Sequence, residues 1–184
     1  REDAEWVWVL DPIDGTISYI HGIPLFGSLI GLLYQGQPVL GVIHQPILRQ
    51  LCIGDGEVTH LNGQAVRVAE APDLAEATLL VTDPCLVPRY QDAAAFERLT
   101  ARCGTFRGWG DCYGYLMVAC GRAHLMLDPV LNPWDLLPLI PVIRGAGGII
   151  SDWRGRDAVT ATAAIAAPPR LHAAALAVLN PGVG

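Results

Sequence analysis

Two carboxylates separated by two residues are the strongest chemical signal in this sequence. Asp11 and Asp14 follow an apolar, aromatic and β-branched run at residues 6–10, which predicts a buried strand. Pro12 lies between them, fixes one backbone angle and helps to aim both carboxylates and the carbonyl of Ile13 at one point. Hard oxygen ligands of this kind suit Mg²⁺. The segment therefore predicts a divalent-cation site at the end of a strand.

The residues that follow add a place for an anion. Gly15 and Thr16 open a short predicted helix at residues 17–21, and the free amides of such a helix start can hold phosphate. A third carboxylate, Asp135, lies in the first turn of a predicted helix at residues 133–144, where the helix dipole favours negative charge. A single aspartate at a helix start is most often a cap, so Asp135 alone does not indicate a metal site. The strand, the acidic turn and the amide-lined helix start around residues 11–16 together predict metal-assisted phosphate chemistry.

The elements that must position these groups form a mixed α/β pattern with antiparallel hairpins in the middle of the chain. We expect strands at residues 6–10, 26–34, 38–44, 51–54, 58–61, 78–82, 123–127 and 148–151. We expect helices at residues 17–21, 90–103, 111–121, 133–144 and 171–179. The tryptophans and Phe26 are expected in the core, and the histidines in structural roles.

Composition limits the remaining possibilities. The 184 residues are 52% hydrophobic and 16% charged, which predicts one folded domain. The net charge of -6 and the lack of a basic run disfavour nucleic acid and anionic membranes as partners. The apolar runs are short or interrupted by proline and arginine, so no membrane span is expected. Five cysteines without a CxxC pair fit a reducing compartment, and we expect a cytoplasmic location.

Two motifs carry a resemblance to a known family. The segment Trp-Val-Leu-Asp-Pro-Ile-Asp-Gly-Thr at residues 8–16 resembles the first signature of the inositol monophosphatase family. The segment Asn-Pro-Trp-Asp at residues 132–135, followed by Pro138 and a glycine-rich run at residues 145–148, resembles its second signature. The two motifs occur in the family's order and at a similar separation. The resemblance covers essentially all 184 residues.

A third segment narrows the resemblance within the family. The residues Trp-Gly-Asp-Cys-Tyr-Gly-Tyr at 109–115 are similar to the Gly-Asp-Cys-Tyr segment of the family's histidinol-phosphate phosphatases. Asp128 and Pro129, which precede the second signature, also resemble that subgroup. Inositol phosphatases usually carry a Gly-Ser/Thr-Ala type of segment where Asp111 stands here. This resemblance implies histidinol phosphate as the first choice of substrate.

The resemblance implies roles for individual residues around the phosphate. Two or three Mg²⁺ ions would be bound by the carboxylates of Asp11, Asp14 and Asp135 and by the carbonyl of Ile13. Thr16 and Asp11 would take part in catalysis, the Thr16 hydroxyl by orienting the attacking water. No covalent intermediate is expected, because a metal-activated water would attack phosphorus in line.

Other residues would hold the rest of the substrate. Gly15 and Thr16 would bind the phosphate through their amides. Asp128 occupies the place of an acidic residue that contacts the alcohol part, and Asp111 and Cys112 would line the same pocket. A cationic amino alcohol would be matched by these additional carboxylates. The expected substrate is therefore a small phosphorylated alcohol.

For the fold, the resemblance implies a layered α-β-α-β-α sandwich of the α/β (α+β) class. Residues 1–184 would form the C-terminal two-thirds of a single domain, truncated at its N-terminus. The family's upstream Gly-Glu-Glu segment, which supplies a further metal-ligand glutamate, does not occur in these residues. Family members are commonly homodimers, so a homodimer is the expected assembly.

The expected function is thus a Mg²⁺-dependent phosphate monoester hydrolase, with histidinol phosphatase of histidine biosynthesis as the first choice. Inositol-1-monophosphatase is an alternative, and a catalytically inactive metal-binding fragment is a second one. A haloacid-dehalogenase-type phosphatase is disfavoured, because its two aspartates stand one residue apart and it normally uses a lysine. Asp11 and Asp14 are separated by two residues, and all 12 basic residues are arginine.

Overall fold

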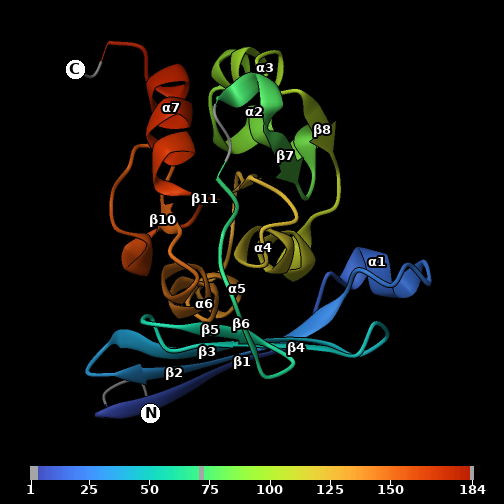
Figure 1. Cartoon of the computed structure of the whole chain (residues 1–184), viewed down its shortest axis with the longest axis vertical. Coiled ribbons are helices and arrows are strands. Elements are labelled where there is room, and N and C mark those ends of the chain that lie inside the picture. The colour runs from blue at the N-terminus through green and yellow to red at the C-terminus, as the bar shows by residue number, and fades with distance from the viewer. Residues whose placement is uncertain (1–3, 71–72, 183–184) are drawn as a thin grey trace.

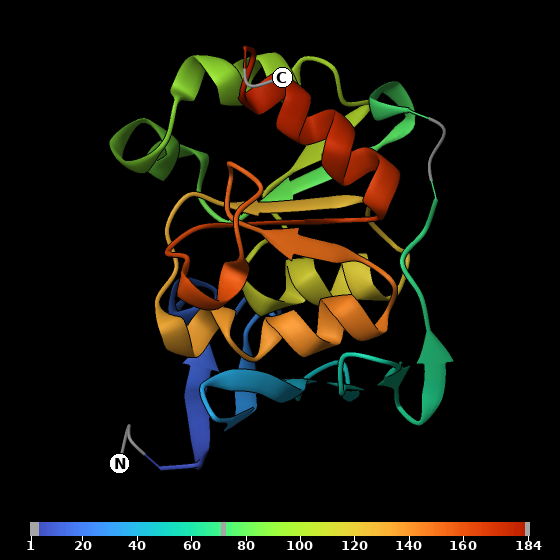
Figure 2. The same ribbon diagram turned by 90° about the vertical axis from the view of Figure 1, so that its left-hand side faces the viewer.

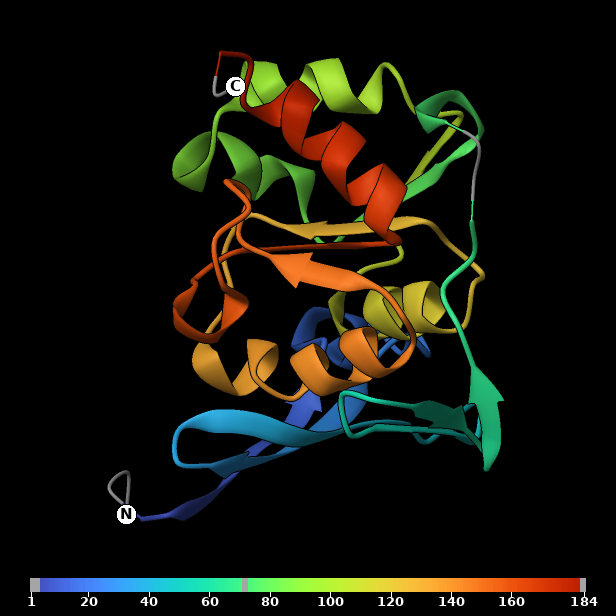
Figure 3. The same ribbon diagram turned by 60° about the vertical axis from the view of Figure 1, so that its left-hand side comes forward.

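The computed structural model describes residues 4–70 and 73–182. These residues form four alternating layers: a six-stranded sheet, a layer of helices, a five-stranded sheet and an outer layer of helices (Figure 1). Figures 2 and 3 show the same four layers from two further sides. The expected layered α/β architecture is confirmed, and the described residues supply four layers of the five-layer sandwich.

The six-stranded sheet is an antiparallel meander in the order β1-β2-β3-β4-β5-β6. Short turns connect the strands from β2 onward, and such turns suit antiparallel neighbours, whereas β1 and β2 are connected by a longer segment that contains a helix. The strands are β1 (Trp6–Asp14), β2 (Gly27–Tyr34), β3 (Gln37–Gln45), β4 (Gln50–Gly54), β5 (Thr59–Leu61) and β6 (Gln64–Val66). The expected central hairpins are confirmed. β1 extends four residues beyond its expected end, so the acidic segment belongs to the strand instead of a turn after it.

The five-stranded sheet has the order β10-β11-β9-β7-β8 and is mixed. Its strands are β7 (Thr78–Val81), β8 (Thr105–Arg107), β9 (Leu125–Asp128), β10 (Ile149–Ser151) and β11 (Ala164–Ala167). β7 pairs in parallel with β8 and β9, because helices connect these strands. Every residue of β9 and β11 is buried, since helices cover both faces of this sheet. β8 and β11 were not expected from the sequence.

Helices fill the space between the sheets and cover the far side of the five-stranded sheet (Figure 1). The α-helices are α1 (Thr16–Ile20), α2 (Val87–Tyr90), α3 (Ala93–Thr100), α4 (Asp111–Ala119), α5 (Pro133–Leu136), α6 (Leu139–Gly145) and α7 (Pro169–Leu179). Short 3-10 turns are η1 (Leu74–Glu76), η2 (Pro84–Leu86) and η3 (Ala158–Thr160). None of the helices in residues 4–70 and 73–182 is long and apolar enough to cross a membrane.

Two expected helices differ from the prediction in the structure. The helix expected at residues 133–144 separates into α5 and α6, because Pro138 has no backbone amide to continue the hydrogen-bond ladder. The helix expected at residues 90–103 is shorter and forms α3, and it is preceded by the unexpected α2, with Gln91 extended between them. Asp92 then accepts a hydrogen bond from the amide of Ala95 at 3.0 Å and caps α3.

Glycines on the inner face of the large sheet let the α5–α6 segment approach closely. A side chain at Gly41 would overlap the carbonyl oxygen of Pro138, and a Cβ at Gly54 would lie 2.6 Å from Cα of Val142. A Cβ at Gly31 would meet Cγ of Pro138 at 3.2 Å. Backbone therefore packs on backbone along this seam, which fixes α5 against the sheet that ends in the acidic segment.

Most tryptophans lie at the surface, contrary to expectation. Trp6 and Trp8 are 53% and 60% exposed on the outer face of the large sheet, which no described helix covers. Trp109 and Trp134 are also exposed, and only Trp153 of the five is buried. Aromatic residues in a strand favour a packed sheet surface. They do not indicate which face of the sheet is covered by other elements of the described residues.

Candidate active site

The end of β1 holds the first two carboxylates in an irregular stretch of strand. The pairing of β1 with β2 shifts register between Asp11 and Asp14. The Ser28 hydroxyl donates to the carbonyl of Pro12 at 2.7 Å, and the amide of Ile13 donates to Oδ1 of Asp11 at 3.0 Å. These bonds hold the segment in a fixed conformation, and neither of them uses Oδ2 of Asp11.

Asp135 reaches the same place from the first turn of α5. Its Oδ2 accepts hydrogen bonds from the backbone and side-chain nitrogens of Asn132, at 3.0 and 3.2 Å. This capping box satisfies the start of the helix. Oδ1 of Asp135 takes no part in the capping box, so one carboxylate can cap the helix and still offer an oxygen to a ligand.

The three carboxylates converge. One side-chain oxygen from each of Asp11, Asp14 and Asp135 lies within 4.8 Å of the others. Burial raises the pKa of Asp14 to about 7, against two hydrogen bonds from Cys112 that lower it. Burial raises the pKa of Asp135, and the neighbouring carboxyl of Asp11 raises it further. Hydrogen bonds from Asn132 act in the opposite direction. Like charges this close are stabilised by a proton or a cation, and an all-oxygen donor set fits a hard divalent cation.

The start of α4 brings two more expected residues to the site. The amide of Cys112 donates to Oδ2 of Asp14 at 2.5 Å, and the amide of Asp111 donates to the hydroxyl of Thr82 at 2.8 Å. Asp111 has a positive φ of 52°, an uncommon conformation for a residue other than glycine. Backbone strain of this kind clusters at functional sites, where the surroundings enforce it.

Gly15 and Thr16 lie beside this helix start. Gly15 has a φ of 81°, and a Cβ on it would lie 3.0 Å from Oδ2 of Asp111. The site therefore needs glycine there for both conformation and space. Thr16 begins α1, whose first amides have no acceptor within the helix. Burial raises the pKa of Asp111 to about 6, with a smaller opposite effect from the hydrogen bond to Ser18 in α1.

Asp128 lies at the end of β9 and is only 2% exposed. The Tyr115 hydroxyl donates to its Oδ2 at 2.9 Å, and the amide of Thr82 donates to its Oδ1 at 3.3 Å. Burial raises the pKa of Asp128 to about 8, which these hydrogen bonds only partly offset. Tyr115 and Thr82 were not expected at the site. Tyr115 belongs to the motif at residues 109–115, and that motif was the feature of the sequence that could have indicated its place at the site.

A cavity of about 130 Å³ is lined by part of these groups, and Asp11, Gly15 and Thr16 are not among its lining residues. Five of its lining residues are aspartates, namely Asp14, Asp83, Asp111, Asp128 and Asp135, and none is arginine or histidine. Asp83 was missed by the sequence analysis, although it precedes Pro84 at a strand end much as Asp11 precedes Pro12. The lining is therefore acidic throughout, although burial keeps a proton on Asp128 at neutral pH when no cation is bound.

The buried carboxyl of Asp128 predicts a pH effect on stability. Its pKa of about 8 exceeds the ordinary value of 3.8, so between these values the folded state keeps a proton that the unfolded state releases. The free energy of unfolding of the cation-free protein should therefore fall as the pH rises from about 5 to about 8. Urea denaturation at about pH 5 and at about pH 8 measures this fall. It should be smaller for Asp128→Asn than for the unaltered protein. Equal falls in both proteins would contradict the assignment.

The comparisons with known proteins agree with this geometry. The sequence profile described as "Inositol monophosphatase family" matches residues 1–181. The chain belongs to the inositol monophosphatase family. Members of this family are phosphatases, and the fold agrees: an inositol monophosphatase from Zymomonas mobilis superposes with a TM-score of 0.91 at 36% identity, covering 97% of this chain and 72% of that one.

Two curated relatives are similar to most of this chain. A bifunctional chloroplastic phosphatase of Arabidopsis thaliana is 46% identical over 157 residues, covering 85% of this chain and 45% of the relative. A histidinol-phosphatase of Chlorobaculum parvum is 39% identical over 153 residues, covering 83% of this chain and 59% of the relative. The chain thus spans about half the length of these curated relatives.

Proposed function

We propose that this chain belongs to a metal-dependent phosphatase that hydrolyses the phosphate monoester of a small cationic alcohol, with histidinol phosphate as the first choice. The observation that carries the proposal is the convergence of Asp11, Asp14 and Asp135 within 4.8 Å, beside a cavity that Asp14 and Asp135 line together with further carboxylates. Membership of the inositol monophosphatase family supports the reaction class.

The cation would be Mg²⁺, in two or three copies, as the family resemblance implies. Asp11, Asp14 and Asp135 would bind it through their converging oxygens, together with the carbonyl of Ile13. A bound divalent cation supplies Lewis-acid neutralisation of phosphate oxygens and a water of lowered pKa. The hydrogen bonds from Asn132 and Cys112 hold two of these carboxylates in place, which reduces the reorganisation needed on binding.

The chain's own residues would position the substrate. The amides of Gly15 and Thr16 would donate to the phosphate at the start of α1, and the Thr16 hydroxyl would orient the attacking water. Asp11 would also hold this water in line. Asp128 and Asp111 would face the alcohol part, with the backbone of Cys112 keeping Asp14 in position.

The charge of the cavity supports a cationic alcohol over a neutral one. Asp83 and Asp128 line it in addition to the carboxylates nearest the proposed cation, and no basic side chain of the described residues lines it. An imidazolium or ammonium group would be matched by the ionised carboxylates of this set, and its positive charge would favour release of the proton that burial keeps on Asp128. Histidinol-phosphatases from Chlorobaculum parvum and Mycobacterium tuberculosis are 39% and 32% identical to this chain.

Turnover by the complete protein tests the substrate. With Mg²⁺ present, kcat/KM for histidinol phosphate should exceed that for inositol 1-phosphate by at least about tenfold, equivalent to about 1.4 kcal/mol of preference. Asp83→Asn should reduce the ratio, because Asp83 lines the cavity. Glu97→Gln, at an exposed position of α3, is the charge-matched control. A strong preference for inositol 1-phosphate would reject histidinol phosphate as the substrate.

Inositol-1-monophosphatase activity is the second candidate, favoured by the 36% identity to the Zymomonas mobilis inositol monophosphatase. The absence of any phosphate release from either substrate with Mg²⁺ would favour the remaining alternative, a catalytically inactive metal-binding protein. The expected homodimer and cytoplasmic location stay predictions.

A further inference from the structure

Thr82 directly follows β7 and lines the cavity of about 130 Å³, which we call the acidic cavity. β7 runs parallel to β9 with Val81 opposite Leu127, so the residues that come next, Thr82 and Asp128, lie side by side at the carboxyl ends of the two strands. The amide of Thr82 donates to Oδ1 of Asp128 at 3.3 Å. Thr82 is therefore bonded to one of the two carboxylates that would face the alcohol part of the substrate.

The hydroxyl of Thr82 holds the residue that carries the other carboxylate, Asp111. The amide of Asp111 donates to Oγ1 of Thr82 at 2.8 Å, and this bond helps to keep Asp111 at its positive φ of 52°. A Cβ on Gly110 would overlap Cα of Thr82, so the backbone that leads into α4 rests directly on Thr82. Because the backbone conformation sets the direction in which a side chain leaves the chain, Thr82 influences where the Asp111 carboxylate points.

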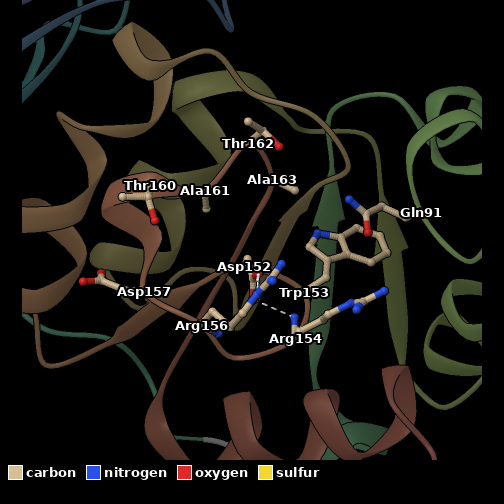
Figure 4. Close-up of a pocket in the computed structure, with 10 residues that line it drawn as sticks. All are labelled: Gln91, Asp152, Trp153, Arg154, Arg156, Asp157, Thr160, Ala161, Thr162 and Ala163. Atoms are coloured by element: carbon tan, nitrogen blue, oxygen red, sulfur yellow. Dashed lines mark hydrogen bonds and ion pairs between the residues drawn. The ribbon is translucent and has the colours of Figure 1, made fainter.

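The backbone of Asp128 is held separately from its side chain. Trp153, whose indole Figure 4 shows among the residues that line another cavity, donates from Nε1 to the carbonyl of Asp128 at 3.0 Å. With the backbone fixed, the hydroxyl of Tyr115 and the amide of Thr82 determine the direction of the carboxylate. Burial raises the pKa of Asp128 to about 8, and a hydrogen bond from the Thr82 side chain is the largest effect that lowers it. The Thr82 hydroxyl thus favours the ionised form, which attracts a cation.

We propose that Thr82 is a positioning residue for substrate recognition, which holds the carboxylates of Asp111 and Asp128 in the direction of the cationic alcohol part. This inference rests on the proposed function and adds to it a residue that acts through its two neighbours. Thr82 touches neither the reacting phosphate nor the cation. Its contribution is to keep two carboxylates of like charge close together, so that one positive group can meet both of them.

The kinetic test compares two phosphate monoesters in the complete protein with Mg²⁺. Histidinol phosphate carries a cationic alcohol part, and phenyl phosphate carries none. Thr82→Val keeps the shape of the side chain but cannot accept from the amide of Asp111. It should lower kcat/KM for histidinol phosphate by about tenfold more than for phenyl phosphate, the size expected for one hydrogen bond. The loss should lie in KM, because the alcohol part is bound alike in the ground and transition states. Thr82→Ser keeps the hydroxyl and should restore the ratio.

Two measurements by ¹H–¹⁵N NMR do not require turnover. Hydrogen exchange of the Asp111 amide should be faster in Thr82→Val than in the unaltered protein and in Thr82→Ser, because the valine leaves this amide without its acceptor. A titration with L-histidinol, the dephosphorylated alcohol, should give a Kd about tenfold higher for Thr82→Val. Thr100→Val is the matched control: it removes a hydroxyl that donates to the carbonyl of Glu97 at 3.0 Å in α3, and it should change neither result.

Equal losses for the two esters would show a purely structural role for Thr82 and would overturn the proposal, as would a ratio that Thr82→Val leaves unchanged or Thr82→Ser fails to restore. If the unaltered protein releases phosphate from neither ester, the proposed function fails, and the histidinol titration then decides on Thr82 alone. In that titration, the same Kd for Thr82→Val and the unaltered protein, or no saturable binding by either, would overturn the role of Thr82.

Discussion

Replacing Asp135 with asparagine in the complete protein is expected to lower kcat/KM by at least about 10²- to 10³-fold, more than is typical for a residue that only supports a metal ligand. The side chain offers one oxygen to the convergent site and uses the other to cap α5. Asparagine can retain the capping oxygen, but it removes the negative charge that a divalent cation needs. The loss should therefore fall on Mg²⁺ affinity and turnover while the fold persists.

The measurement is Mg²⁺-dependent phosphate release together with Mg²⁺ binding by calorimetry. Glu97→Gln is the matched control, because it removes an exposed carboxylate of α3 that lies outside the proposed site. Circular dichroism should show the same melting behaviour for the control and the Asp135 variant within a few degrees. Unchanged turnover in Asp135→Asn would remove Asp135 from the proposed cation site.

Gly41→Ala is expected to destabilise the protein by about 3 kcal/mol or more, the upper part of the range for overpacking a core. The added methyl group would overlap the Pro138 carbonyl, and backbone on both sides leaves no flexible side chain to move away. Relief requires α6 to shift away from the sheet. Because α5 precedes α6 directly, the shift would also separate Asp135 from Asp11 and Asp14, and Mg²⁺ affinity should fall as well.

Urea denaturation measures the stability change. Gly108→Ala is the control, since a Cβ there meets only the carbonyl of Val81, at 3.9 Å, and the backbone has no positive φ. That substitution should change the free energy of unfolding by less than about 1 kcal/mol. If the two variants proved equally stable, the close approach of α6 to the sheet would not be a constraint on the fold.

The sequence predicted the carboxylate pair because its signal is local. Asp11 and Asp14 stand close in the chain, with a strand before them and a helix start after them, so their types and spacing already imply a shared direction. Asp135 carried only a helix-start signal, and it was the family resemblance that joined it to the pair. In the structure all three lie together.

The parts that could not be predicted depend on distant packing. Tyr115 and Thr82 reach Asp128 from different elements, and nothing in the local pattern of either marks that meeting. The strand β11 reads Ala-Ile-Ala-Ala, a sequence of low strand propensity that is placed by its neighbours β9 and β10. The exposure of Trp6 and Trp8 depends on which face of the sheet is covered, which the residue types alone do not specify.

The position of β1 at the margin of its sheet has a consequence for dynamics. Within the described residues β1 is hydrogen-bonded to β2 alone, whereas β9 lies between two strands. Strands held on one side are the first to open in sub-global fluctuations, and they lose amide protection before the interior does. A cation bound by Asp11, Asp14 and Asp135 would connect β1 to α5. We therefore expect a bound cation to oppose the opening of β1, because opening would separate Asp11 and Asp14 from Asp135.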